Sequence, residues 1–282
     1  MRTLMIRILR WVIRYAASSY IAGLETKDAI RVCRHIAENG SRSTICPWDG
    51  PHDVPEAVAL SYKEAINSIA DEKLDCYLSI KVPSLAYDLK LVTELVIIAR
   101  DHGIRIHFDS LAPDTATASI ALLQKTLKIY HNVSYTLPSR WRRSIVDAER
   151  MVDLGIPVRL VKGQWPDPSE PNIDAGSNFL NLVDVLAGRA SLVAIATHDA
   201  QLARESLTRL KRAGTACELE QLYGLPMRDS VARSLGIPVR VYIPYGYAYL
   251  SYSLSAVRKR PIILAWLLKD FLAGVKKRLT DS

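Results

Sequence analysis

Charged and hydrogen-bonding side chains recur at the carboxyl ends of short runs rich in β-branched and aromatic residues. Lys81, Asp109 and the pair Thr197 and His198 each close or directly follow such a run. Further members of this set lie within or just after other runs: Arg159, Lys162, Gly163, Glu218 and Tyr242. Cations of this kind suit an anionic or electron-rich ligand, and hydroxyl or imidazole groups suit phosphate or ribose oxygens. The helix expected to begin after Thr197 and His198 would add backbone N–H donors for a phosphate. A single polar residue after a strand is usually only solvated, so the recurrence is the informative feature.

Eight such runs alternate with segments of helical periodicity from about residue 26 onward. The runs are 42–46, 76–81, 104–108, 132–136, 158–162, 192–196, 215–219 and 239–243. Apolar residues recur at a spacing near 3.6 between them, as in 53–71, 88–101, 115–129, 145–154 and 200–212. This alternation predicts parallel βαβ units and a single α/β domain over 1–282, a TIM-like (β/α)8 barrel with extra helices at both ends. An open doubly wound sheet is the alternative.

Composition narrows the classes of function. The formal net charge of +8 fits a basic surface or attraction to an anionic ligand, and we find no nucleic-acid motif. The four cysteines have no metal-ligand spacing, so we expect no metal site and reduced thiols in a cytoplasmic protein. Neither GxGxxG nor a P-loop is present, which excludes a nucleotide held in the Rossmann manner.

Both ends of the chain have amphipathic patterns. In residues 1–18, arginines recur every three to four positions between apolar residues, which predicts an amphipathic helix rather than a signal peptide or a membrane span. The segment 261–279 is similar and ends in three basic residues. Each helix is expected either to pack on the barrel or to contact an anionic membrane surface, so peripheral membrane contact is a second expected location.

In order and spacing, these segments resemble the proline dehydrogenase family. The similarity is carried by RLVKG at 159–163, ATHD at 196–199, the E-x-x-x-L-Y-G stretch at 218–224 and RVYIPYG at 240–246. Lys81 and Asp109 match the family's strand-two lysine and strand-three aspartate. The resemblance covers almost the whole chain from about residue 18, and the joint order is more specific than any single motif.

The resemblance implies a distorted (β/α)8 barrel that binds FAD non-covalently at the strand carboxyl ends. It implies that Arg159 approaches the N5 and O4 edge of the flavin, and that Lys162 and Glu218 hold its ribityl and ribose region. Gly163 would lie in the same cofactor-binding loop. Thr197 and His198 would meet the pyrophosphate and adenine portion. The implied reaction is hydride transfer from a C–H bond beside nitrogen to flavin N5.

Three positions depart from the family pattern. The two adjacent arginines that clamp the substrate carboxylate are matched by Ser255 and Ala256, which cannot form a bidentate charged clamp. A glutamine that touches the flavin is matched by Pro138, and an acidic residue in the loop after strand three by Leu111. We therefore expect a substrate other than free proline: a proline derivative, a carrier-bound proline or an amine without a free carboxylate.

We assign Lys81, Asp109 and Tyr252 to the catalytic site, and Tyr242, Ser255 and Ala256 to the substrate pocket. The expected electron acceptor is a quinone, oxygen or a partner protein. Two alternatives stay open: a degenerate, non-catalytic barrel that binds a ligand or partner, and a barrel enzyme that uses Lys81 or Lys162 as a Schiff-base lysine.

Overall fold

Eight parallel strands close into a barrel in the order β1 to β8. The computed structural model describes residues 20–50 and 52–247. The closed barrel is confirmed, and the open sheet is excluded, because β1 pairs with both β2 and β8. The expectations for 1–18, 261–279, Tyr252, Ser255 and Ala256 lie outside the described residues.

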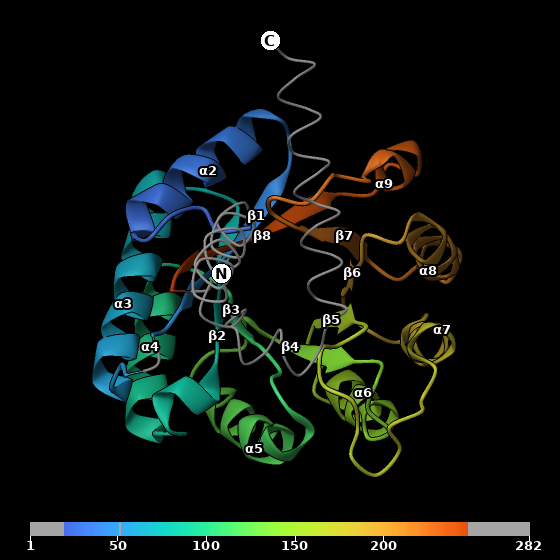
Figure 1. The fold of residues 1–282 in the computed structure, drawn as a ribbon, viewed down its shortest axis with the longest axis horizontal. Coiled ribbons are helices and arrows are strands. Elements are labelled where there is room, and N and C mark those ends of the chain that lie inside the picture. The colour runs from blue at the N-terminus through green and yellow to red at the C-terminus, as the bar shows by residue number, and fades with distance from the viewer. Residues whose placement is uncertain (1–19, 51, 248–282) are drawn as a thin grey trace, which may run out of the picture.

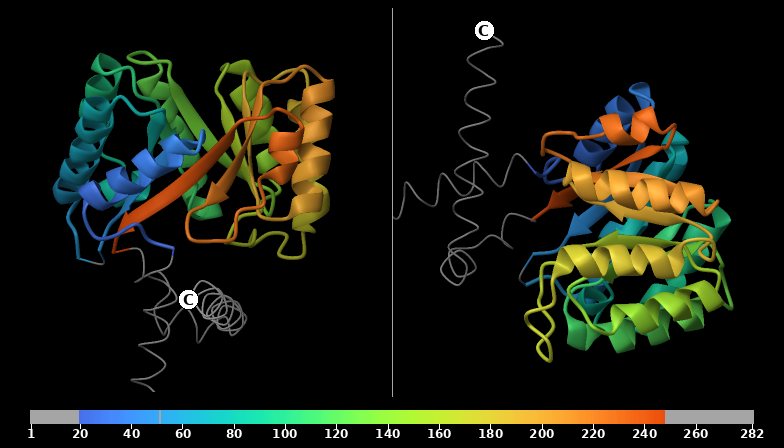
Figure 2. Two further views of the ribbon diagram at one scale, coloured as in Figure 1. Left: turned by 90° about the horizontal axis from the view of Figure 1, so that it is seen from above. Right: turned by 90° about the vertical axis from the view of Figure 1, so that its right-hand side faces the viewer.

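The strands form the inner ring and the helices surround it (Figure 1). The strands are β1 (Arg42–Trp48), β2 (Cys76–Ile80), β3 (Ile106–Phe108), β4 (Val133–Pro138), β5 (Val158–Val161), β6 (Val193–Ala196), β7 (Cys217–Leu222) and β8 (Val239–Gly246). The helices include α2 (Thr26–Glu38), α3 (Pro55–Glu72), α4 (Leu89–Asp101), α5 (Ala116–Thr126), α6 (Ser144–Asp153), α7 (Ala175–Leu186), α8 (Ala200–Arg212) and α9 (Ser230–Ser234). Short 3-10 turns, Val82–Leu85 and Pro113–Thr115, follow β2 and β3. Figure 2 shows α7 and α8 lying against the outside of the barrel wall.

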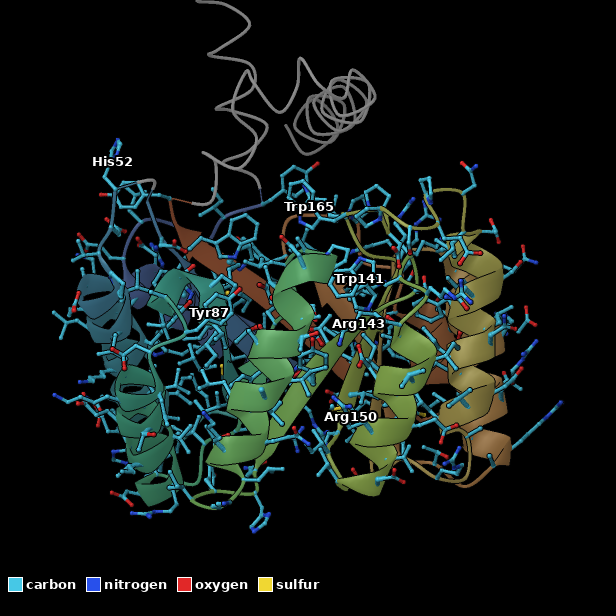
Figure 3. All side chains as sticks on the ribbon, turned by 90° about the horizontal axis from the view of Figure 1, so that it is seen from below. His52, Tyr87, Trp141, Arg143, Arg150 and Trp165 are labelled. Carbon is cyan, nitrogen blue, oxygen red and sulfur yellow. The ribbon has the colours of Figure 1, made fainter. Side chains whose placement is uncertain are left out.

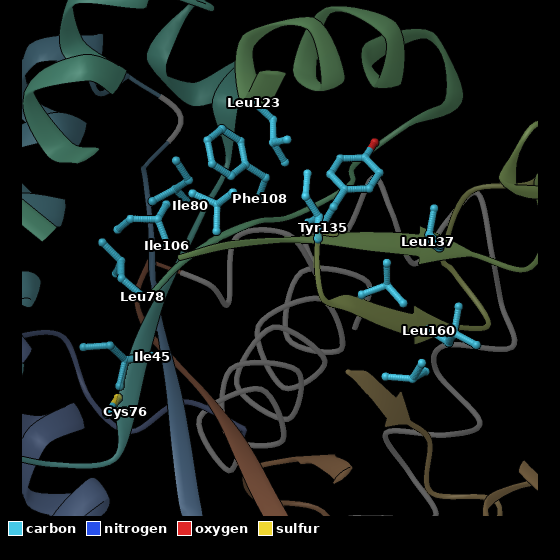
Figure 4. Packing of buried hydrophobic residues seen from close by; sticks show 14 of the residues in the cluster. Ile45, Cys76, Leu78, Ile80, Ile106, Phe108, Leu123, Tyr135, Leu137 and Leu160 are labelled. Atoms are coloured by element: carbon cyan, nitrogen blue, oxygen red, sulfur yellow. The ribbon is translucent and has the colours of Figure 1, made fainter. Parts of the chain in front are cut away.

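The alternation of side chains along each strand separates an apolar layer from a polar one. In β2 the apolar Leu78 and Ile80 lie in the core between strands and helices, which Figure 4 shows together with Phe108, Tyr135 and Leu160. Residues on the opposite face of the strands are largely polar, and they point into the barrel. Core burial therefore fixes the register of each strand, because a slip by one residue would exchange the two faces.

Strand β7 differs from its expected position. The sequence predicts 215–219, but the strand runs from Cys217 to Leu222. Thr215 still belongs to the loop that ends α8, since its amide donates to the Leu210 carbonyl and its hydroxyl accepts from the Gly188 amide. The strand thus extends three residues further toward the carboxyl end than the sequence predicts.

No helix in the described part of the chain is long and apolar enough to cross a membrane.

Candidate active site in the barrel lumen

A buried arginine–glutamate pair joins β5 and β7 inside the barrel. Arg159 donates from Nε and NH2 to the two carboxylate oxygens of Glu220, at 2.7 and 2.8 Å. The two side chains are 4% and 1% exposed. Because β6 lies between β5 and β7, this bidentate contact bridges the inner face of β6. Burial alone disfavours the charge of Arg159, but the nearby Glu220 and Asp109 carboxylates outweigh it and raise the pKa of Arg159.

Asp109 and Tyr242 lie beside this pair, toward the end of the barrel where the strands have their carboxyl ends. We call this end the mouth. Arg159 NH1 is 3.5 Å from Asp109 Oδ1, and the guanidinium lies 5.0 Å from the centre of the Tyr242 ring. The Tyr242 hydroxyl donates to Asp109 Oδ2 at 3.2 Å. Burial, together with Cys46 and Asp109, raises the pKa of Tyr242 well above its usual value, so the hydroxyl stays protonated. The structure thus brings Arg159, Asp109 and Tyr242 together from β5, β3 and β8.

A directed chain of hydrogen bonds leads to Asp109. The Thr136 hydroxyl donates to Asp109 Oδ1 at 2.9 Å, so it accepts from His107 Nε2 at 2.6 Å. His107 therefore carries its proton on Nε2, and Nδ1 accepts from the Ser134 hydroxyl at 2.7 Å. Burial, with neighbouring arginines, lowers the pKa of His107 well below its usual value. This neutral imidazole lies in the lumen, and it helps to position the Asp109 carboxylate through Thr136.

Lys81 approaches the same mouth from the end of β2. Its ammonium lies 3.1 Å from Cys46 Sγ and 4.5 Å from the centre of the Trp48 ring, and its side chain is buried. The Lys81 amide donates to the Tyr62 hydroxyl at 3.0 Å, which anchors the backbone. Among the described residues, no carboxylate forms an ion pair with this ammonium. A buried cation without an anion partner is suited to meeting an anionic ligand group.

Gly163 forms a tight turn against the end of β4. Its φ is +84°, and a Cβ at this position would lie 2.8 Å from Pro138 Cβ. Arg140 donates from Nε to the Gly163 carbonyl at 2.9 Å. Pro138 thus supports the turn by packing. Leu111 is half-buried in the loop after β3.

The loop after β5 continues from this turn across the mouth. Trp141 Nε1 donates to the Trp165 carbonyl at 2.9 Å. Figure 3 shows Trp165 and His52, which follow β5 and β1, at the same end of the barrel. The loops that follow the strands therefore surround the mouth, as expected for this fold.

The side chains of Thr197 and His198, which follow β6, already form hydrogen bonds within the protein. His198 Nε2 accepts from the Leu222 amide at 2.9 Å, so Nδ1 carries the proton and faces the Pro226 carbonyl at 3.4 Å. Both ring nitrogens are engaged, and burial lowers the pKa of His198. The Thr197 hydroxyl accepts from the Asp199 amide at 3.1 Å and keeps its own hydrogen for a ligand.

Asp199 fills the position at which backbone donors of α8 were expected to be free. Its carboxylate caps the helix by accepting hydrogen bonds from the Gln201 and Leu202 amides. The same carboxylate forms an ion pair with the Lys162 ammonium at 3.1 Å. The expected anion site at this helix N-terminus is therefore already occupied by the chain's own carboxylate. Lys162 remains partly exposed and near the mouth.

Glu218 lies away from the mouth, contrary to the prediction. It is fully buried near the amino end of β7, where it accepts from Arg240 at 2.8 Å and lies 3.5 Å from Arg42. The misplaced strand end explains the error: since β7 continues to Leu222, Glu218 is its second residue, and Glu220 is the one that reaches the site. The alternating charge pattern E-L-E was the signal in the sequence that would have indicated Glu220.

A separate hollow lies at the opposite end of the barrel. It encloses about 600 Å³ and includes Arg42, Tyr77, Arg105, Glu218 and Arg240 in its lining. Its guanidinium groups are largely engaged, because Arg240 and Arg42 share Glu218 and Asp75, and Arg105 donates to Asn132 at 3.0 Å. The amino ends of barrel strands generally serve stability, so we place the site at the mouth.

Comparisons with known proteins agree on one family. Proline dehydrogenase 1 of Bacillus subtilis (strain 168) is 25% identical over 279 residues, covering 92% of this chain and 91% of that protein. Proline dehydrogenase 2 of the same strain is 26% identical over 280 residues, with the same coverage. The proline dehydrogenase of Deinococcus radiodurans is 28% identical over 284 residues, covering 92% and 90%. No protein-family model matches this chain.

Solved structures share the fold. Proline utilization A (PutA) from Bdellovibrio bacteriovorus, inactivated by N-propargylglycine, aligns with a TM-score of 0.71 at 16% identity over 85% of this chain. PutA from Corynebacterium freiburgense aligns with a TM-score of 0.70 at 16% identity over 98% of this chain. This chain spans about a third of the length of either PutA, 32% and 34%.

Proposed function

This chain belongs to the proline dehydrogenase family, and from that premise we propose that it is an FAD-dependent oxidoreductase acting on the C–N bond of a proline-like amine or imino acid. The observation that carries the proposal is the placement of Arg159 in the lumen, where its NH1 edge is turned to Asp109 and Tyr242 beneath the mouth. Strands β3, β5 and β8 deliver these three groups to one point.

The donors at the mouth suit FAD. Arg159 NH1, the Thr197 hydroxyl hydrogen and the Lys162 ammonium are directed donors for flavin carbonyl, hydroxyl or phosphate oxygens. We propose that these residues, with the Gly163 turn, hold the cofactor. We do not retain His198 and Glu218 as cofactor ligands, because their polar atoms are engaged within the protein.

When bound, FAD would supply the acceptor for a hydride from the carbon beside the substrate nitrogen, and that nitrogen would lose a proton as the C=N bond forms. Asp109 is held in place by Thr136 and Tyr242, so its carboxylate is fixed beside the site where the nitrogen gains positive character. A fixed carboxylate at that position stabilises the developing charge electrostatically. The electrons then pass to a quinone, oxygen or a protein acceptor.

The charges of the mouth support a substrate other than free proline. Arg159 is neutralised by Glu220, and Lys162 by Asp199. Lys81 has no carboxylate partner among the described residues, so it offers a free carboxylate one charged contact, which is weaker than a bidentate arginine clamp. With Ser255 and Ala256 at the expected clamp positions, we propose a proline derivative, carrier-bound proline or another cyclic amine as substrate.

The alternative of a non-catalytic barrel draws support from one observation. His198 and the α8 N-terminus, two of the expected phosphate ligands, are satisfied by the protein itself. If the remaining donors do not suffice, the barrel would bind a ligand or partner without flavin chemistry.

An absorption spectrum followed by anaerobic substrate mixing tests these proposals. The protein is purified with added FAD and desalted, and it should keep a flavin spectrum. L-Prolinamide and pyrrolidine should then bleach it faster than L-proline. A protein that never retains FAD would support the non-catalytic barrel. Rapid bleaching by L-proline would contradict the altered specificity, and borohydride trapping of a substrate carbonyl on lysine would favour the Schiff-base alternative.

A further inference from the structure

We propose that Glu220 is a positioning residue that fixes the orientation of Arg159, cancels its charge and thereby lowers the reduction potential of the bound flavin. This inference rests on the proposed function, because it requires FAD at the mouth. Neither the family resemblance nor the strand-end pattern pointed to Glu220.

The geometry leaves Arg159 one free edge. Glu220 accepts from both Nε and NH2, and the fork shape of the guanidinium then fixes its plane. NH1 is the nitrogen turned toward Asp109, at the longer distance of 3.5 Å. From across the lumen, the Tyr77 hydroxyl lies 3.5 Å from Glu220 Oε2 and helps to hold the carboxylate. Without Glu220, the long arginine side chain would lose its two short contacts and could adopt other rotamers.

The pair also changes the electrostatic potential at a ligand bound at the mouth. A lone buried guanidinium would present a full positive charge in a medium of low effective dielectric constant. With Glu220 in bidentate contact, the two charges largely cancel beyond the pair. Two-electron reduction makes the flavin more negative, and a nearby positive charge favours the reduced state. By cancelling that charge, Glu220 favours the oxidised state and lowers the potential.

The chain contains a matched control in the same strand. Glu218 is also buried and also paired with an arginine, Arg240, at 2.8 Å. It lies two residues nearer the amino end of β7, about 7 Å further from the mouth at the rise per residue of a strand. Glu218→Gln therefore removes the same charge, from the same strand, away from the flavin.

The experiment measures the potential of bound FAD by anaerobic titration against a reference dye. In Glu220→Gln, the ratio of reduced to oxidised flavin at a fixed solution potential should rise at least tenfold. This corresponds to a rise of about 30 mV in the reduction potential of a two-electron couple. In Glu218→Gln, the ratio should change less than threefold. Equal shifts in the two variants, or no shift in Glu220→Gln, would overturn the inference. A wild-type protein that takes up no FAD would instead refute the proposed function.

A second comparison applies if Glu220→Gln alone does not fold. The double variant Arg159→Gln/Glu220→Gln removes both buried charges, and Arg159→Gln is its reference because it removes only the arginine charge. The potential should fall in Arg159→Gln and return toward the wild-type value in the double variant, because the charges are removed together. A double variant with the same potential as Arg159→Gln would show that Glu220 has no electrostatic effect on the flavin.

Discussion

Two buried arginine–glutamate pairs lie inside this barrel, and they differ in how completely they are satisfied. At the floor, which is the end of the barrel where the strands have their amino ends, Arg240 donates to Glu218, the Ser43 carbonyl and Asp75. Each nitrogen of its guanidinium therefore has a partner. Nearer the mouth, Arg159 donates to Glu220 from two nitrogens only, and its third faces a carboxylate at 3.5 Å. Both pairs are buried, so a buried charge alone does not identify the site. The difference is that NH1 of Arg159 makes no short hydrogen bond within the described protein, whereas all three nitrogens of Arg240 do.

The strongest test removes the arginine from each pair. Arg159→Met leaves Glu220 buried with only the Tyr77 hydroxyl nearby, and we expect a loss of about 3–5 kcal/mol in the free energy of unfolding together with weaker FAD binding. Arg240→Met should also destabilise the protein, but it should retain FAD, because the mouth is unchanged. Denaturant unfolding and the flavin spectrum of the folded protein give the two readouts. Loss of FAD in both variants to the same degree would contradict the distinction between floor and mouth.

The sequence predicts the barrel well because its information is local and repeated. Each strand is a short run bounded by a turn, and glycines such as Gly155 and Gly214 end helices at positive φ. The alternation of eight units then leaves few topologies. Most strand ends fall within two residues of their expected positions, which suffices to place Lys81, Asp109 and Arg159 correctly.

The same reasoning fails where contacts between different strands and loops decide the outcome. Glu220 and Gln221 read as the polar end of a strand, yet the strand continues because Arg159, more than sixty residues earlier, satisfies Glu220. Likewise, nothing in the local sequence shows that the Leu222 amide occupies His198 Nε2, or that Asp199 caps its own helix while binding Lys162. Such pairings depend on the closed ring and not on spacing.

A second test concerns the turn that borders the mouth. Gly163→Ala introduces a Cβ at 2.8 Å from Pro138 Cβ at a φ of +84°, so we expect a loss of about 2–4 kcal/mol in unfolding free energy and weaker FAD retention. Gly155→Ala is the matched control, because its φ is +67° and nothing lies within 4 Å of the added Cβ. It should cost about 1 kcal/mol and leave FAD retention unchanged. Equal destabilisation would show that backbone conformation alone, without the contact, determines the effect.

A third test uses pH, because burial disfavours the protonated form of two imidazoles, His107 in β3 and His198 after β6. The pKa of His107 is lowered well below 6.5 in the folded protein, and that of His198 is also lowered. Below pH 6.5 the unfolded chain binds protons that the folded chain does not, so the free energy of unfolding should fall as the pH falls. The expected slope is about 1.4 kcal/mol per pH unit for each imidazole that stays neutral.

Chemical denaturation between pH 7.5 and 5.5 measures this slope. His107→Gln should make it shallower by about one proton, whatever its effect on absolute stability. An unchanged slope in that variant would show that His107 is not the buried neutral group that the hydrogen-bond chain to Asp109 requires.

The smallest expected effect on stability is at the rim of the mouth. Lys162 and Asp199 form a pair whose side chains are 41% and 45% exposed, so Lys162→Ala should change the unfolding free energy by no more than about 0.5 kcal/mol. If Lys162 meets an anionic part of FAD, the affinity for FAD should nevertheless fall about tenfold at low ionic strength, and less at high salt. Arg189→Ala breaks a pair with Glu149 of similar exposure, 44% and 45%, on the outer helices, and it should leave FAD affinity unchanged. Equal FAD affinities in the two variants would remove Lys162 from the cofactor site and confine that site to the lumen.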